Sequence, residues 1–302
     1  MTVIELIRRS ALYMPGSNAR ALEKAREISA DALIFDLEDA VAPDAKVRAR
    51  SQVCEAVKAR NYPGHETVIR INALSTSWGA DDLAAACAVC PDAILIPKVE
   101  TPDDIVAVAR LMDGQAAPKT IRIWAMMETP RAMLNALAIA DTTRGEGNRL
   151  AVFVMGTNDL AKDTRVRLGK DRSAILPWLM NCIAAARASG LAILDGVYND
   201  LEDDEGFRRE CEIGRDLGMD GKTLIHPKQV DTCNRIFSPT EAEVAWAESV
   251  KAAFDDPAHA NVGVVKVNGQ MVERLHLDIA RRILTVSALN KETPSAQELQ
   301  NG

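Results

Sequence analysis

The segment Ala32-Leu-Ile-Phe-Asp-Leu-Glu-Asp39 is a short apolar run that ends on three acidic residues. Similar runs rich in Val, Ile and Leu alternate along the chain with amphipathic stretches, a pattern typical of parallel strands covered by helices. The predicted strands are residues 11–14, 32–37, 67–72, 93–98, 122–127, 151–156, 192–196 and 222–226. Eight such units over roughly 225 residues fit a (β/α)8 TIM barrel. We therefore expect residues 1–237 to form one catalytic barrel domain.

The stretches between the predicted strands begin with helix-start signals. Ser17 is the expected cap of a helix that runs to about Ser29, and Pro43 precedes one that runs to about Arg60. Thr101, followed by a proline and two aspartates, opens another. Each predicted strand is thus followed by a predicted helix.

Residues 238–302 are not needed for a barrel and are predicted to form a C-terminal helical extension. Apolar spacing predicts a helix over residues 239–254 and, after a turn at Gly269, a second helix over about 271–288. The polar last residues, 290–302, are expected to fray. The extension is too short and charged for an independent domain, so we expect it to cover the barrel mouth or contact a neighbouring subunit.

The composition is that of a soluble globular protein, with 302 residues of which 47% are hydrophobic and 26% charged. No run of about 18 apolar residues occurs, which predicts a cytoplasmic protein without a membrane span. The net charge of −7 argues against nucleic-acid binding and favours small-molecule partners. Only Cys87 and Cys90 have CxxC spacing, so we expect reduced core thiols and no zinc site.

Ionisable residues stand at the predicted strand ends, where the active sites of barrels form. They are Asp36, Glu38 and Asp39 after the second strand, Arg70 in the third, and Lys98, Glu128 and Asp159 after the fourth, fifth and sixth. Crowded carboxylates repel one another unless a cation lies among them, and oxygen ligands favour a hard ion such as Mg²⁺. The sequence therefore predicts a magnesium site, with Glu128 and Asp159 as the strongest candidates. For Asp36, capping of the next helix explains an acid at this position at least as well as a role in the metal site does.

Several of these residues have a structural and a functional interpretation. Arg70 could capture a carboxylate with its guanidinium fork, or form a structural ion pair with the acids of residues 36–39. Lys98 could be an ion-pair partner or a catalytic group, including a Schiff-base lysine. The turn from Tyr13 into a helix N-terminus could receive a phosphate, although it lacks a complete phosphate-binding motif. For His226, a hydrogen-bonded structural role is more common than a catalytic one.

With these residues in view, the chain resembles the citrate lyase β-subunit and malyl-CoA lyase family, part of the HpcH/HpaI-like aldolases. The resemblance is carried by residues 12–17, 31–46, 68–72, 96–99, 128, 156–159, 203–207, 221–229 and 269–273. It implies a barrel that binds Mg²⁺, or Mn²⁺ in its place, through Glu128 and Asp159. Glu38 and Asp39 would hold metal-bound waters.

The resemblance also implies how a substrate would bind. Arg70 would grip the carboxylate of a 2-oxo acid, which makes Arg70, Lys98, Glu38 and Glu128 the candidate substrate-binding residues. The coenzyme A part of a thioester would enter over Tyr13, Lys24, Ile225 and His226. The family forms trimers or hexamers, so we expect a homotrimer or homohexamer.

Catalysis in this family uses an aspartate in a turn of the C-terminal segment, and the matching residue here is Glu273. Glu273 joins Arg70 and Asp39 as a catalytic candidate. The exchange lengthens the acidic side chain by one methylene, and a misplacement of about 1 Å can cost about 100-fold in rate. Asn18 is a second departure, since malyl-CoA lyases carry an arginine there.

The leading expectation is a magnesium-dependent CoA-ester lyase. Such an enzyme reversibly cleaves a carbon–carbon bond of a 3-hydroxyacyl-CoA of the malyl-, methylmalyl- or citramalyl-CoA type. The products are an acyl-CoA and a 2-oxo acid, glyoxylate or pyruvate. Two other functions stay open, namely hydrolysis of the malyl-CoA thioester, and cleavage of a citryl thioester as one subunit of a larger lyase. A non-catalytic scaffold is disfavoured because every matched metal and anion position is present.

Overall fold

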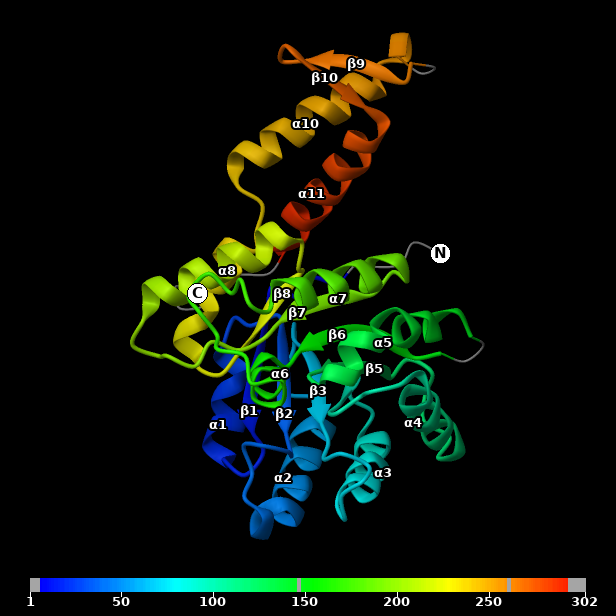
Figure 1. Ribbon diagram of the computed structural model, residues 1–302, viewed down its shortest axis with the longest axis vertical. Helices are drawn as coiled ribbons and strands as arrows, with labels where there is room; N and C mark the ends of the chain where they lie inside the picture. The colour runs from blue at the N-terminus through cyan, green and yellow to red at the C-terminus, as the bar shows by residue number, and fades with distance from the viewer. Residues whose placement is uncertain (1–5, 146–147, 260–261, 293–302) are drawn as a thin grey trace. The chain divides into compact units, whose positions relative to one another are not determined.

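The computed structural model describes residues 6–145, 148–259 and 262–292 (Figure 1). The chain divides into two compact units. One lies within Arg8–Asn234, and the other contains, of the described residues, 6–7, 235–259 and 262–292. Most of the polar tail that was expected to fray, residues 293–302, lies outside the described residues.

The larger unit is a closed barrel of eight parallel strands, which confirms the predicted (β/α)8 TIM barrel (Figure 1). The strands are β1 (Ser10–Pro15), β2 (Ala32–Asp36), β3 (Glu66–Arg70), β4 (Ala93–Ile96), β5 (Arg122–Met127), β6 (Leu150–Met155), β7 (Ala192–Asp195) and β8 (Gly221–Leu224). The barrel closes where β8 pairs with β1, Lys222 lying opposite Ser10. The apolar runs of the sequence therefore mark the strands because a barrel wall is buried on both faces.

Helices surround the barrel (Figure 1). They are α1 (Ala19–Lys24), α2 (Lys46–Lys58), α3 (Gly79–Val89), α4 (Pro102–Gly114), α5 (Pro130–Ala140), α6 (Thr157–Thr164), α7 (Leu176–Ala188), α8 (Asp204–Leu217) and α9 (Val230–Ile236). Short 3-10 turns are η1 (Ala25–Glu27), η2 (Pro43–Ala45), η3 (Asp141–Arg144), η4 (Pro227–Gln229) and, in the C-terminal unit, η5 (Pro257–His259).

The predicted helix starts agree with the structure except near the first helix. The cap of this helix is Asn18 and not Ser17, because the side-chain oxygen of Asn18 accepts the backbone N–H of Ala21 at 3.1 Å. The helix also stops at Lys24 and continues only as the 3-10 turn η1, short of the predicted Ser29. At α4 the expected start is present, and Thr101 forms a capping box.

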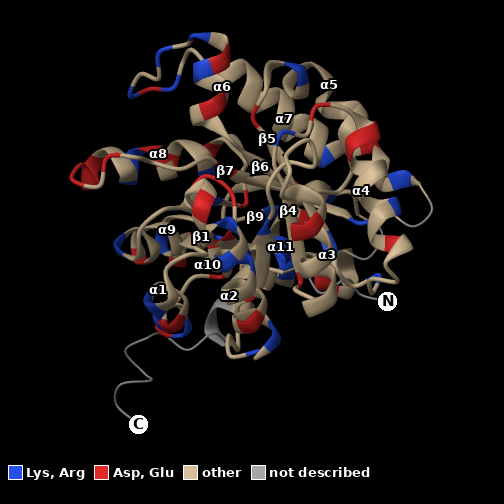
Figure 2. Cartoon of the chain, turned by 90° about the horizontal axis from the view of Figure 1, so that it is seen from below, with Lys and Arg blue, Asp and Glu red and all other residues tan. Residues whose placement is uncertain are grey.

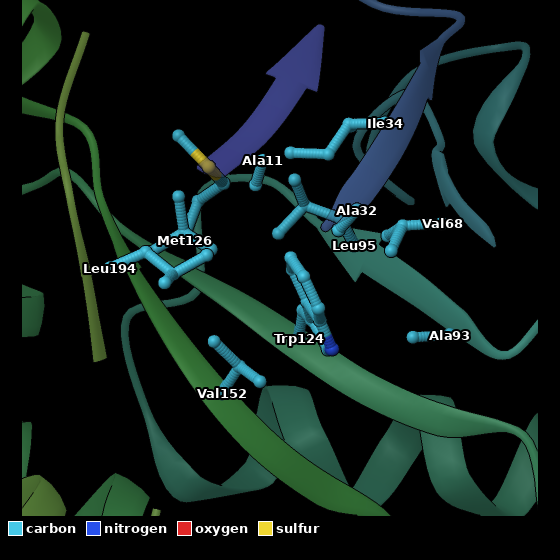
Figure 3. Packing of buried hydrophobic residues seen from close by; sticks show 11 residues of the cluster. Ala11, Ala32, Ile34, Val68, Ala93, Leu95, Trp124, Met126, Val152 and Leu194 are labelled. Atoms are coloured by element: carbon cyan, nitrogen blue, oxygen red, sulfur yellow. The ribbon is translucent and has the colours of Figure 1, made fainter. Parts of the chain in front are cut away.

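The barrel interior is filled by apolar side chains. The large ring of Trp124 lies among short side chains that include Ala11, Ala32 and Ala93 (Figure 3). Trp124 is fully buried, as are these alanines. Pairing a large side chain with small ones fills the interior at the density of a packed core, not a pore. Polar side chains that could bind a substrate are therefore expected at the ends of the barrel and not in its centre.

A buried charge network lies between the barrel wall and α8, and the sequence did not predict it. Lys222 donates to Asp195 at 2.9 Å and to Glu210 at 2.6 Å, while Arg172 donates to both oxygens of Asp195 at 2.7 and 2.6 Å. Burial alone would raise the pKa of Asp195, but Lys222 and Arg172 outweigh it and lower that pKa to about 2. Elsewhere, acidic and basic residues are spread over the outer helices (Figure 2).

The C-terminal unit contains α10 (Glu241–Asp255), a two-stranded hairpin of β9 (Val264–Val267) and β10 (Gln270–Glu273), and α11 (Arg274–Glu292). The prediction of a helix from Met271 is wrong for the first residues. Asn268 and Gly269 both have positive φ angles, 49° and 85°, which make a tight two-residue hairpin turn. The turn pairs Met271 with Lys266, so residues 270–273 become a strand.

The apolar face of the hairpin packs on the two long helices. Val265, Val267 and Val272 form a cluster with side chains of α10 and α11, among them Phe254 and Leu277. This cluster gives the C-terminal unit a small core of its own. Among the described helices, none combines the length and the apolar character that a membrane crossing requires.

Candidate active site

An ion pair between the ends of β2 and β3 organises one side of the barrel mouth. Asp36 and Arg70 lie opposite each other in the strand register, and Arg70 donates Nε–H and Nη2–H to the two Asp36 oxygens, both at 2.6 Å. Asp36 is fully buried and Arg70 is 7% exposed. The Asp36 oxygens also accept the backbone N–H groups of Glu38 and Ala40. The structural ion pair that the sequence left open for Arg70 is therefore present.

The remaining guanidinium nitrogen of Arg70 lies beside two further acids. Nη1 donates to Asp39 Oδ2 at 3.1 Å and lies 2.9 Å from Glu38 Oε2. That Glu38 oxygen is buried and has no aligned hydrogen-bond partner, so the contact is an ion pair only. Burial raises the pKa of Glu38 to about 8, against the lowering effect of Arg70. The Tyr13 ring lies against the guanidinium, with 4.8 Å between Arg70 Cζ and the ring centroid.

On the other side of the mouth, Lys98 connects Glu128 and Asp159. The Lys98 backbone N–H donates to Glu128 Oε1 at 2.8 Å, and its ammonium lies 2.6 Å from Asp159 and 3.6 Å from Glu128. Lys98 has a φ of 54°, a left-handed conformation that is uncommon for a residue with a side chain. Burial raises the pKa of Glu128, and the Lys98 charge acts against this rise. The strand-end residues predicted from β4, β5 and β6 are thus brought together.

Gly156, at the end of β6, has no side chain, and Glu128 occupies the space that a side chain would need. A Cβ atom at position 156 would lie 2.4 Å from Glu128 Cβ and 2.7 Å from Glu128 Oε2. Real Cβ atoms do not approach so closely, so only glycine fits beside Glu128 in this position. Gly156 was not among the predicted site residues.

The donor set at Glu128 and Asp159 fits a magnesium ion. Within the described residues, no group of three or more His, Cys, Asp or Glu side chains is arranged to hold a metal. Mg²⁺, however, is usually held by one or two carboxylates together with water and substrate oxygens. Glu128 is 1% exposed, so its charged form would gain from a cation. The two residues could therefore hold the metal, while Lys98 already supplies one positive charge between them.

The four predicted coenzyme A contacts differ in exposure: three are exposed and Tyr13 is partly buried. Lys24 is exposed in the last turn of α1, and Ile225 and His226 are exposed after β8. The backbone N–H groups of Ile225 and His226 donate to Gln229 Oε1, and His226 Nδ1 accepts a backbone N–H of η4 at 3.1 Å. Tyr13 instead directs its hydroxyl to a methionine sulfur inside the barrel. As coenzyme A contacts, these four residues stay predictions.

The remaining catalytic candidate, Glu273, lies at the end of β10 in the C-terminal unit. Its side chain is exposed, and its backbone N–H donates to His276 Nδ1 at 2.9 Å. Its catalytic role stays a prediction. For Asp36, the ion pair with Arg70 was one of two interpretations left open, and the orientation of Asp36 into the barrel mouth was not predicted. Strand parity could have indicated it, because Asp36 shares the inward face of β2 with Ala32 and Ile34.

Comparison with known proteins places this geometry among related enzymes. Residues 9–227 match the family model described as HpcH/HpaI aldolase/citrate lyase. A protein of Cereibacter sphaeroides named (3S)-malyl-CoA thioesterase is 48% identical over 91% of this chain and 93% of its own length. The citrate lyase subunit beta of Escherichia coli K12 is 34% identical, with 94% of each chain covered.

A solved structure is similar over nearly the whole chain. It is the protein CitE from Mycobacterium tuberculosis in complex with magnesium, acetoacetate and coenzyme A, which is 27% identical with a TM-score of 0.74. The match covers 93% of this chain and 98% of that one. Its bound magnesium and coenzyme A are properties of that relative.

Proposed function

Because the chain belongs to the HpcH/HpaI aldolase/citrate lyase family, we propose that it is a magnesium-dependent enzyme that hydrolyses a malyl-CoA-type thioester. The observation that carries this proposal is the 48% identity to a (3S)-malyl-CoA thioesterase over 91% of the chain. It favours hydrolysis, which the sequence left open, over the carbon–carbon cleavage that we expected first. The mouth of the barrel supplies the matching chemistry, with acids for a metal and a cation for a carboxylate.

In this proposal the barrel residues hold the two ends of the malyl group. Glu128 and Asp159 would hold Mg²⁺, which supplies positive charge to substrate oxygens when it is bound. Glu38 and Asp39 would hold water molecules bound to the metal. Arg70 would bind the terminal carboxylate, since an arginine pairs strongly with carboxylates. Lys98 adds positive charge beside Asp159.

Hydrolysis needs one proton acceptor and one proton donor. A water oxygen attacks the thioester carbonyl carbon, the C–S bond breaks, and malate and the free thiol of coenzyme A are released. We assign Glu273 to take the proton from the water and return it to the sulfur. Its place in the C-terminal unit is consistent with the expected homotrimer or homohexamer, in which that segment would reach a neighbouring site.

A product assay tests the proposal. The protein is incubated with malyl-CoA and Mg²⁺, and free thiol, malate, acetyl-CoA and glyoxylate are all measured. Hydrolysis predicts equal amounts of thiol and malate, without glyoxylate. Glu128→Gln should abolish turnover, whereas Glu55→Gln, which changes an exposed acid of α2, should leave it intact. Absence of all four products in the wild-type reaction would reject the proposal.

Carbon–carbon cleavage is the second candidate. It is supported by the 34% identity to the citrate lyase subunit beta of Escherichia coli and by the similarity to CitE. The same assay decides between the two, because a lyase forms acetyl-CoA and glyoxylate without free thiol. A citryl-thioester lyase subunit would turn over none of the free CoA esters and would require an acyl-carrier partner.

A further inference from the structure

The contacts of Arg70 suggest a further role for two residues, Asp36 and Tyr13. Nε and Nη2 of Arg70 are both committed to Asp36 at 2.6 Å. The Asp36 carboxylate is itself fixed, because each of its oxygens also accepts a backbone N–H of the β2–α2 loop, at 2.8 and 2.9 Å. Asp36 therefore cannot rotate without breaking four hydrogen bonds.

Tyr13 restricts the guanidinium from a second direction. Its ring, on β1, lies 4.8 Å from Arg70 Cζ, within the range of a cation–π contact. The phenol is held in turn, because its hydroxyl lies 3.5 Å from the sulfur of Met126. Asp36 fixes the direction of the guanidinium plane, and Tyr13 closes off one of its faces.

We propose that Asp36 and Tyr13 are positioning residues that present Arg70 Nη1 as the donor to the substrate carboxylate. Among the described contacts, Nη1 has only Glu38 and Asp39 as acidic neighbours. The Asp39 side chain is 68% exposed. A substrate carboxylate can therefore replace Asp39 at Arg70 Nη1, and the displaced Asp39 carboxylate stays in contact with solvent. The inference rests on the proposed function for the identity of that carboxylate.

This arrangement makes a specific prediction about selectivity. Arg70 meets the carboxylate through one nitrogen and not through its fork, so recognition depends on where Nη1 is placed. Displacement of the guanidinium by about 1 Å should then break this charge-assisted hydrogen bond and weaken carboxylate binding by about 10-fold to 100-fold. Coenzyme A binding should not change when Asp36 is replaced, because the predicted coenzyme A contacts include neither Asp36 nor Arg70.

The experiment measures malate and coenzyme A binding separately by calorimetry in the presence of Mg²⁺. Tyr13→Leu removes the ring, and malate affinity should fall about fivefold to thirtyfold, the range of a desolvated cation–π contact. Tyr13→Phe keeps the ring and should bind malate within about twofold of the wild type. Tyr62→Leu is the control, because it removes the ring of a buried tyrosine that packs on Phe35 and not on Arg70. It should leave malate binding unchanged.

Asp36→Asn provides the second test, and its malate affinity should fall by about 10-fold to 100-fold. If this variant does not fold, Tyr13→Leu and Tyr13→Phe still decide the question. Unchanged malate binding in Tyr13→Leu, or an equal loss of affinity for malate and coenzyme A in Asp36→Asn, would overturn the inference. Failure of the proposed function looks different, because the wild-type protein would then release no thiol from malyl-CoA.

Discussion

Replacement of Gly156 by alanine should disable the candidate metal site while leaving the barrel folded. The φ of Gly156 is −96°, which any residue can adopt, so the effect comes from space alone. The new Cβ would lie 2.4 Å from Glu128 Cβ, whereas carbon atoms in contact prefer about 3.5–4.0 Å. Glu128 or the end of β6 must therefore move by about 1 Å.

The size of the effect follows from this displacement. Forcing one extra carbon into a packed region typically costs about 1–3 kcal/mol of unfolding free energy. For a domain of this size, each kcal/mol lowers Tm by about 2–4 °C. A 1 Å shift of a group that holds the metal can lower the rate about 100-fold. We thus expect a modest loss of stability and a large loss of Mg²⁺-dependent turnover.

Thermal unfolding with increasing Mg²⁺, together with turnover of malyl-CoA, measures both effects. Gly114→Ala is the matched control, since a Cβ at the end of α4 meets no atom within 4 Å. The control should keep the Mg²⁺-induced rise in Tm of the wild type, and Gly156→Ala should lose most of it. If the Tm of Gly156→Ala rises with Mg²⁺ as much as that of the wild type, Glu128 is not a ligand of the metal.

Three further predictions concern other parts of the molecule. Lys98→Met removes the ammonium 2.6 Å from Asp159, so the metal-free protein should melt at a lower temperature and gain more from Mg²⁺ than the wild type; an equal gain would contradict this. Asp195→Asn removes the buried acid that pairs with both Lys222 and Arg172, leaves Glu210 as their acidic neighbour, and should cost about 3–5 kcal/mol at pH 7 in chemical denaturation. Since the folded pKa of Asp195 is about 2, below its ordinary value, its contribution is present above pH 4. The stability difference between wild type and Asp195→Asn should therefore shrink as pH falls from 4 to 2, and a constant difference would refute this assignment. Gly269→Ala places a side chain at a φ of 85°, which should destabilise the hairpin by about 1 kcal/mol or more and raise its amide hydrogen exchange; unchanged exchange would count against the turn.

The strands and the strand-end acids could be predicted because both depend on local sequence. Short apolar runs rich in Val, Ile and Leu mark most of the barrel strands, and the polar residues that follow such a run lie near the strand end. Glu128 and Asp159 were found in this way, and the structure joins them through Lys98. The hairpin at Asn268 and Gly269 was also predictable from a local signal, although we assigned its second strand to a helix.

The partners of each charged group were decided only by the tertiary structure. The fork of Arg70 binds Asp36 because closure of the barrel sets the register between β2 and β3, and no local pattern specifies that register. The left-handed backbone of Lys98 likewise depends on the Glu128 carboxylate of the neighbouring strand. Lys222 looked like an ordinary strand residue, yet it is fully buried against Asp195. Sequence position determined which residues reach the mouth, whereas strand register and burial determined which of them pair and which remain available to a substrate.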